Sequence, residues 1–102
     1  GSNPGFYAYS AAKAGVEGMT RAFANDLATR GITVNCVTPG VIADTQMTTG
    51  MNSADNPMAK KIPMQRFGGP DEVASAVRWL ASPGASYVTG VIVPVNGGQH
   101  YR

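Results

Sequence analysis

Two side chains near the start of the chain, Tyr9 and Lys13, have types and a spacing that could transfer a proton. They lie four residues apart, so on a helix both project from the same face. A phenol with a pKa of about 10 is a poor acid or base at neutral pH, but a nearby ammonium group lowers that pKa. The pair could then give a proton to a carbonyl oxygen or take one from an alcohol. The alternative is a half-buried tyrosine beside a solvated lysine.

The element that must position this pair is a long helix. The pattern predicts a turn at residues 3–5, a helix from about Ala8, and an end at Gly31. Glycine inside a helix costs up to about 1 kcal/mol relative to alanine, so two of them need a reason in packing. We expect another helix or a sheet to approach this surface closely. It consists of a line of small residues and a neighbouring line of larger ones, Ala11, Gly15, Gly18 and Ala22, and Val16, Met19, Phe23 and Leu27.

The rest of the chain alternates between strand and helix signals. A β-branched run predicts a strand at residues 32–37, and a strand directly after a helix is typical of a parallel α/β unit. A methionine-bearing loop is expected at residues 41–69; it is too long to be a simple connection, so it should be functional, mobile or contain short helices. A second helix is predicted from residues 69–72 to residue 82, with Val73, Val77 and Leu80 on its buried face. A last strand at residues 91–95 contains Pro94, which belongs on a sheet edge.

Composition excludes several classes of protein. The chain has 102 residues, 43% of them apolar, with a net charge of +2 and no basic stripe, so we expect no nucleic-acid partner. No apolar run is long enough to cross a membrane, so no membrane partner is expected. The single cysteine, Cys36, and the lack of a secretory signal favour the cytoplasm. Gly1 and Ser2 are interpreted as a remnant of recombinant expression, and no cluster of metal-ligating residues is present, so no metal is expected.

Several segments, in order, resemble the short-chain dehydrogenase/reductase family, and its 3-oxoacyl-carrier-protein reductase type most closely. They are the Tyr-Ser-Ala-Ala-Lys helix at residues 9–16, the strand and Pro-Gly turn at 31–40, the segments at 66–74 and 87–90, and the Val-Asn-Gly-Gly turn at 95–98. The resemblance implies an α/β fold: the C-terminal portion of a doubly wound Rossmann-type parallel sheet, in the order helix, strand, long loop, helix, edge strand. Residues 3–102 would form a single partial domain.

The resemblance also implies roles for particular residues. Tyr9 would be the general acid/base, and Lys13 would lower its pKa and hydrogen-bond the nicotinamide ribose. The backbone after the Pro39-Gly40 turn, at Val41 and Ile42, would meet the nicotinamide carboxamide, and Thr45 would add a hydroxyl. The family usually has one residue between the isoleucine and the threonine, whereas this chain has two. In the family the loop covers the substrate; the alternative is ordinary loop packing.

Other family features are not found in these 102 residues. The catalytic serine, about thirteen residues before the tyrosine in the family, and the glycine-rich phosphate turn are both missing. NAD or NADP is therefore the cofactor of the parent family, with none expected on this chain alone. The first hypothesis is the C-terminal segment of an NAD(P)-dependent oxidoreductase that acts on a small carbonyl or alcohol substrate, inactive in isolation. The second is a non-catalytic assembly module that keeps the family's oligomer surfaces.

Two expectations about behaviour follow. Residues 43–63 should be the least ordered part of the chain, because their substrate and cofactor are missing. The chain should also form a homodimer or a higher homo-oligomer, because two strands and an apolar helix surface need to be covered.

Overall fold

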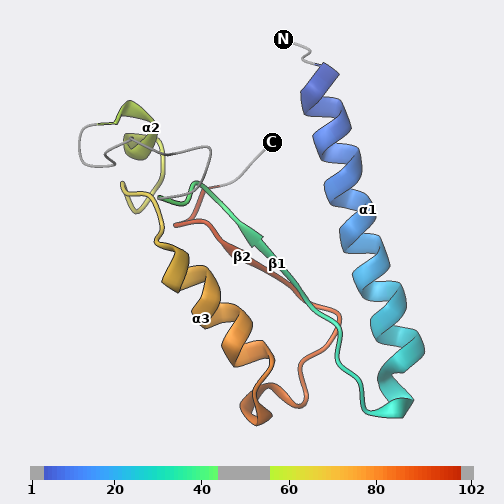
Figure 1. The fold of residues 1–102 in the computed structure, drawn as a ribbon. Coiled ribbons are helices and arrows are strands. Elements are labelled where there is room, and N and C mark those ends of the chain that lie inside the picture. Colours follow the sequence, from blue (N-terminus) through green and yellow to red (C-terminus); the bar gives the residue numbers. More distant parts are fainter. Residues whose placement is uncertain (1–3, 44–55, 100–102) are drawn as a thin grey trace.

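The computed structural model describes residues 4–43 and 56–99 of the chain. The elements are α1 (Pro4–Leu27), β1 (Cys36–Pro39), α2 (Pro57–Lys60), α3 (Pro70–Leu80) and β2 (Ile92–Val95). The two strands pair in parallel, with Cys36 opposite Ile92 and Pro39 opposite Val95. The sheet lies between α3 and α1 (Figure 1). The predicted order of elements and the predicted parallel sheet are therefore confirmed.

Helix α1 begins at Pro4, four residues earlier than the sequence predicts. Proline suits the first turn of a helix because no N–H is needed there, so the predicted turn at residues 3–5 is wrong. The helix continues through a short 3-10 turn to Gly31, which has φ 73° and donates its N–H to the carbonyl oxygen of Ala28. Gly31 therefore ends the helix as the sequence predicts.

The face of α1 that turns toward the sheet differs from the predicted one. The less exposed residues recur every three or four positions, at Lys13, Glu17, Thr20, Ala24 and Leu27. Thr20 and Ala24 are buried, and the Thr20 hydroxyl donates to the carbonyl oxygen of Val16 at 2.8 Å. The contact face is thus a line of mixed polarity. Of the two predicted apolar lines, only Leu27 belongs to it among the described residues.

The two predicted apolar lines of α1 are largely exposed. Phe23 has 53% of its surface exposed, and Val16 and Met19 are similar. Nothing within the described residues lies within 4 Å of where a Cβ would stand on Gly15 or Gly18. The close approach that these glycines predict is therefore not made inside the described part of the chain.

Strand β1 begins at Cys36 rather than at residue 32, and Asn35 explains the difference. The Asn35 side-chain amide donates to the carbonyl oxygen of Val88 at 3.1 Å and accepts from the N–H of Val91 at 3.1 Å. One residue earlier, the Val34 N–H donates to the Thr89 hydroxyl. Before Cys36, side chains thus join the two segments together with one backbone hydrogen bond, from the Gly90 N–H to Val34 O at 2.8 Å. Cys36 itself is half-buried.

The sheet places both of its prolines where they break no hydrogen bond. The N–H of Cys36 donates to Val91 O at 3.0 Å and that of Gly40 to Val95 O at 2.9 Å, so alternate residues of β1 bond toward β2. The backbone nitrogen of Pro39 therefore lies on the outer edge of β1. By the same alternation Pro94 faces the outer edge of β2, as the sequence predicts.

Helix α3 matches its predicted limits, but its buried face is narrower than predicted. Proline occupies its first turn, with Gly69 as the preceding cap residue. Val73 and Leu80 are half-buried against the sheet, whereas Val77 has 51% of its surface exposed. Val77 lines a groove of about 350 Å³ together with Leu80 and one face of β1. The prediction that Val77 is buried is therefore wrong within this chain.

The described part of the long connection is compact. Ala59, at 1% exposure, Ile62 and Phe67 form a buried cluster, against which Val41 and Ala43 pack. Of residues 43–63, which we expect to be least ordered, 44–55 lie outside the described residues. The remainder contains α2 and this cluster, so it is not an open loop.

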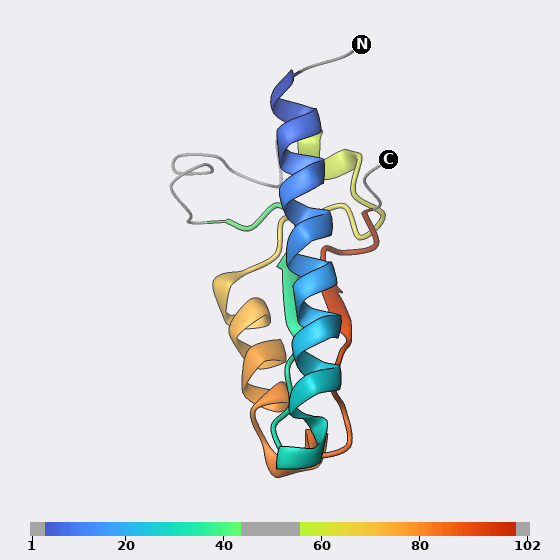
Figure 2. The same cartoon turned by 90° about the vertical axis from the view of Figure 1, so that its right-hand side faces the viewer.

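The molecule as a whole is elongated. Its radius of gyration is 15.7 Å, whereas a compact domain of this length has about 13 Å. Figure 2 shows α1 standing in front of the sheet as a separate layer. No helix of the described residues is both long enough and apolar enough to span a membrane.

Candidate functional site

The sequence-predicted site residues come from two layers of the molecule. Tyr9 and Lys13 belong to α1, on the line that continues its sheet-facing side; Tyr9 is exposed and Lys13 is half-buried. Pro39, Gly40, Val41 and Ile42 form the end of β1 and the turn after it. The N-terminal half of α1 and this end of β1 lie at the same end of the molecule (Figures 1 and 2). This is the carboxyl end of the parallel strands, where open α/β sheets bind ligands.

The structure brings these two groups to one end without packing them together. Toward that end, α1 diverges from the sheet in Figure 1. The buried contacts of α1 lie farther along it, at Thr20 and Ala24. Thr45, predicted to add a hydroxyl, lies outside the described residues.

Gly40 is in close contact with the turn that follows β2. A Cβ at this position would stand 2.8 Å from Cβ of Asn96 and 2.9 Å from its Cα, closer than real Cβ contacts allow. The Asn96 side chain orders its own turn, accepting from the N–H of Gly98 at 3.0 Å and donating to the carbonyl oxygen of Gln99 at 2.7 Å. The glycine is therefore required by the close approach of two backbones, and the turn after β1 rests on a rigid support.

The residues after Gly40 are joined to a segment far along the chain. The Gly68 N–H donates to Val41 O at 3.0 Å, and the Ala43 N–H donates to Gly68 O at 2.8 Å. These two hydrogen bonds form a parallel bridge between Ile42 and Gly68. A Cβ on Gly68 would stand 2.9 Å from Cδ1 of Ile42, the end of a side chain that would have to shift to admit it.

Beside this bridge, Arg66 and Glu72 form a two-pronged ion pair. Arg66 donates to both carboxylate oxygens of Glu72, at 2.7 and 3.0 Å. The same carboxylate accepts the N–H of Gly69 at 2.9 Å, at the start of α3. Hydrogen bonds from Arg66 and then from the Gly69 N–H lower the pKa of Glu72 to about 2. The carboxylate is therefore charged at any pH near neutrality.

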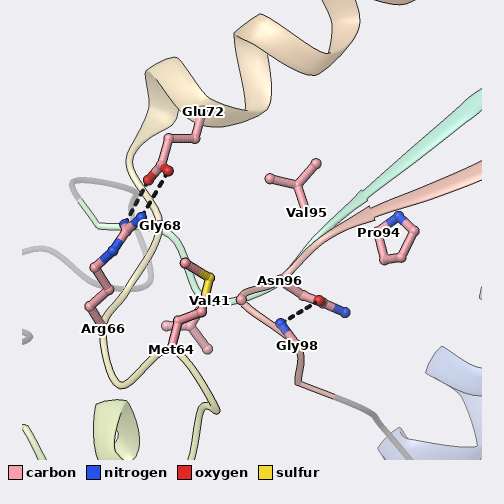
Figure 3. A pocket seen from close by; sticks show the side chains of 10 residues that line it. Val41, Met64, Arg66, Gly68, Glu72, Pro94, Val95, Asn96 and Gly98 are labelled. Atoms are coloured by element: carbon pink, nitrogen blue, oxygen red, sulfur yellow. Dashed lines mark hydrogen bonds and ion pairs between the residues drawn. The ribbon is translucent and has the colours of Figure 1, made fainter.

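These contacts border a hollow of about 280 Å³ at the carboxyl end of the strands. Figure 3 shows the ion pair on one side of it and the Asn96 turn on the other, with Val41 and Met64 between them. The hollow is open, and apolar groups dominate its walls. Its polar lining consists of the ion pair and the turn at residues 96–98.

The turn after β1 leaves one backbone N–H available to a ligand. The N–H groups of Gly40 and Ala43 are used within the chain, but no acceptor among the described residues takes up the N–H of Val41. A carboxamide oxygen could accept from that N–H. The glycine-rich turn that would hold a pyrophosphate is not found in the sequence, so this N–H concerns the nicotinamide end of a dinucleotide alone. Among the described residues, no group of three or more His, Cys, Asp or Glu side chains could hold a metal ion.

Reasoning from the sequence missed the residues that hold the turn. Asn96, Arg66, Gly68 and Glu72 carry its supporting contacts. At the other end of β1, Asn35 carries side-chain contacts, and a weak signal existed for it, since asparagine is depleted in strands and its presence among β-branched residues suggests a side-chain role. The Arg66–Glu72 pair spans six positions with a turn between them, so no helical or strand spacing could reveal it.

Comparison with known proteins identifies relatives along nearly the whole chain. Residues 1–100 match the family model described as enoyl-(acyl carrier protein) reductase. The 3-oxoacyl-(acyl-carrier-protein) reductase of Synechocystis sp. is 52% identical over 98 residues, which are 95% of this chain and 38% of that protein. The 3-oxoacyl-(acyl-carrier-protein) reductase FabG of Pseudomonas aeruginosa is 50% identical over 99 residues, 96% of this chain and 40% of that protein.

A solved structure agrees with these matches. It is the crystal structure of a blue fluorescent protein from a metagenomic library in complex with NADPH, with a TM-score of 0.79 and 39% identity. The match covers 88% of this chain and 36% of that one. The fold is therefore part of a Rossmann-like α/β fold, as predicted, and the chain spans about two-fifths of the length of the curated relatives it matches.

Proposed function

Because the chain belongs to the short-chain dehydrogenase/reductase family, we propose that it supplies the proton-transfer helix and the nicotinamide-contacting turn of an NAD(P)-dependent oxidoreductase. One observation carries the proposal. The Tyr-Lys pair extends the sheet-facing line of α1 toward the same end of the molecule as the turn after β1. That turn has an N–H, on Val41, without an acceptor among the described residues.

The residues of this chain divide the work between proton transfer and binding. Tyr9 Oη donates its proton to a carbonyl oxygen as the substrate is reduced, or takes one from an alcohol in the reverse direction. The Lys13 ammonium, one helical turn away, favours the phenolate and donates a hydrogen bond to the cofactor ribose. The Val41 and Ile42 backbone orients the carboxamide. The bound cofactor supplies the hydride. Binding the pyrophosphate of the cofactor, and supplying the family's serine, requires a segment that resembles the other three-fifths of the relatives.

The substrate, the cofactor and the setting are part of the same proposal. The names of the relatives favour a 3-oxoacyl thioester as the carbonyl substrate. The NADPH complex of the solved relative makes NADPH the first cofactor to test. We place the protein in the cytoplasm as a homo-oligomer, with neither nucleic acid nor membrane as a partner. In isolation the 102-residue chain binds NAD(P) weakly or not at all.

A second candidate function is that of a non-catalytic assembly module. The observation in its favour is the exposed apolar line on α1, with Val16, Met19 and Phe23 (46%, 53% and 53% exposed). In this case the chain associates through α1 and carries out no reaction. The two candidates differ in whether Tyr9 matters.

The experiment uses a hybrid enzyme, in which this chain replaces the matching 98 residues of the Synechocystis relative. NADPH oxidation is followed by absorbance with acetoacetyl-CoA as the substrate. We expect the hybrid to turn over, and Tyr9→Phe to lower kcat on the order of 10³-fold by removing the acid. Tyr7→Phe is the matched control: it removes the same hydroxyl from an exposed tyrosine two residues away and should leave kcat unchanged.

Two outcomes would overturn the proposal. A folded hybrid without any turnover would favour the assembly module. Equal effects of Tyr9→Phe and Tyr7→Phe would remove Tyr9 from the chemistry. The isolated chain, titrated with NADPH in the same buffer, should show no saturable binding, because its sequence lacks the glycine-rich turn that binds a pyrophosphate.

A further inference from the structure

The turn that is proposed to meet the nicotinamide is held by two supports of different kinds. The first is the close contact of Gly40 with Asn96, which comes from the neighbouring strand of the same sheet. The second is Gly68, which bonds to the residues on either side of Ile42 and comes from the segment that leads into α3. The second support has no regular secondary structure of its own, so something else must fix its position.

The Arg66–Glu72 ion pair connects that segment to α3 on both sides of Gly68. Arg66 lies two residues before Gly68, and its guanidinium also donates to the carbonyl oxygen of Phe67 at 3.2 Å. Glu72 bonds to the N–H of Gly69, one residue after Gly68. Residues 66–69 are therefore attached to the first turn of α3 at three atoms. Figure 3 shows the Arg66–Glu72 ion pair beside Gly68, with Val41 close by.

The geometry indicates that this ion pair fixes the position of residues 66–69 rather than adding much to the free energy of folding. The two side chains are 48% and 47% exposed, and exposed ion pairs contribute little to the free energy of folding. A two-pronged guanidinium–carboxylate contact, however, is directional, so it restricts the conformations open to residues 66–69. Gly68 has no side chain that could limit the conformations of this segment.

We propose that Arg66 and Glu72 are positioning residues for the nicotinamide-contacting turn: their ion pair fixes Gly68, and the Gly68 backbone sets the position of the Val41–Ala43 backbone. The proposal rests on the proposed function for its link to the cofactor. The pair touches neither cofactor nor substrate. Its loss allows residues 66–69 to move, weakens the bridge to Ile42 and lets the Val41 N–H turn away from the carboxamide.

The first test measures amide hydrogen exchange in the 102-residue chain. Glu72→Gln keeps the shape of the side chain and an oxygen that can accept from Gly69, but removes the charged two-pronged contact. We expect exchange at the Gly68 and Ala43 amides to accelerate about tenfold, while the Gly40 amide, bonded to Val95 within the sheet, keeps its rate. Asp71→Asn is the matched control, because it removes one negative charge from the same helical turn.

The second test measures kinetics in the hybrid enzyme. Glu72→Gln should raise KM for NADPH about tenfold and lower kcat much less, because the change concerns how the cofactor is held and not the proton transfer. Asp71→Asn should change neither constant. A side chain with a merely structural role would lower the amount of active enzyme, and so kcat, with KM unchanged.

Each arm can overturn the proposal by itself. If Glu72→Gln accelerates exchange equally at all amides, or at none, the pair does not hold the bridge to Ile42. If exchange changes as expected but KM for NADPH does not, the turn does not contact the cofactor through this support. A hybrid that is inactive with the native sequence contradicts the proposed function, while the exchange arm still decides whether the pair positions the turn.

Discussion

The turn after β1 and the helix that carries Tyr9 and Lys13 are held in place in opposite ways. The turn is fixed within the chain, by Asn96 against Gly40 and by the Gly68 bridge. Helix α1 is fixed only in its second half, where Thr20 and Ala24 are buried. Its first half diverges from the sheet (Figure 1). The apolar side chains of Val16, Met19 and Phe23 are exposed.

This difference separates what the two regions can be used for. The turn has its supports within 102 residues, so its conformation should survive in isolation. Tyr9 and Lys13 lie on a helix whose large apolar side chains are exposed within the described residues. We therefore expect the placement of this pair to depend on another polypeptide or a second copy. Substitutions in the turn should therefore act through conformation, and substitutions in α1 through chemistry or association.

After Tyr9→Phe, the largest effect is expected from Lys13→Ala in the hybrid enzyme. It should lower kcat about 100-fold and weaken NADPH binding about tenfold, because one ammonium serves both the phenol and the ribose. Thermal stability should stay unchanged, since the first half of α1 packs little. Arg21→Ala, which removes another cation from the same helix, is the control. A Lys13→Ala enzyme with a normal kcat would show that Lys13 does not assist proton transfer by Tyr9.

The next prediction concerns the apolar line of α1. We expect the isolated chain to form a dimer at low micromolar concentration, and Phe23→Lys to convert it to a monomer by placing a charge on the covered surface. Asn25→Lys adds the same charge on another face of the helix and should leave the dimer intact. Light scattering decides between these outcomes. A monomeric native chain that melts cooperatively would show that α1 needs no cover.

Two glycines, one in each region, test the comparison directly, because replacing them by alanine should change the free energy of unfolding in opposite directions. Gly40→Ala should lower the free energy of unfolding by about 1–3 kcal/mol, since its Cβ would overlap Asn96. Gly18→Ala has free space around it and should raise that free energy by up to about 1 kcal/mol through helix propensity. Denaturant unfolding of both variants measures the difference. In a dimer that buries Gly18 the gain should disappear, which links this prediction to the previous one.

The same contrast explains how much could be predicted from the sequence. Gly31, the start of α3 at Pro70 and the outward-facing Pro94 follow from local backbone chemistry, and each was predicted correctly. The beginning of β1 was predicted wrongly because Asn35 bonds to residues more than fifty positions away. The exposure of Val77 shows that a periodic apolar residue need not find its partner in the same chain.

For the candidate site, the sequence supplied the residues that could do chemistry but not their supports. Tyr9 and Lys13 are singled out by their spacing together with the family resemblance of the residues around them, and the Pro39-Gly40 turn by its composition. Whether these residues act as proposed stays a prediction. The contact between Gly40 and Asn96, and the bridge from Gly68, depend on how three separate segments meet in space. Local sequence patterns do not predict these contacts, because they form between residues that only the tertiary structure brings together.

The smallest expected effect is a loss of stability at low pH, which we expect from the Arg66–Glu72 ion pair beside the turn and not from helix α1. The pKa of Glu72 falls from its usual 4.5 to about 2 in the folded chain, because Arg66 and the Gly69 N–H stabilise the carboxylate. A carboxyl group whose pKa is lowered by folding stabilises the fold above the unfolded pKa and loses that contribution as pH falls through the folded one.

The difference in unfolding midpoint between the native chain and Glu72→Gln should therefore be constant above about pH 5.5 and should shrink between pH 4.5 and 2. It should be modest and reduced by salt, since the pair is exposed. Denaturant titrations of both proteins between pH 7 and pH 2.5 measure it, and a difference that persists unchanged at the acid end would mean that the ion pair does not form in solution.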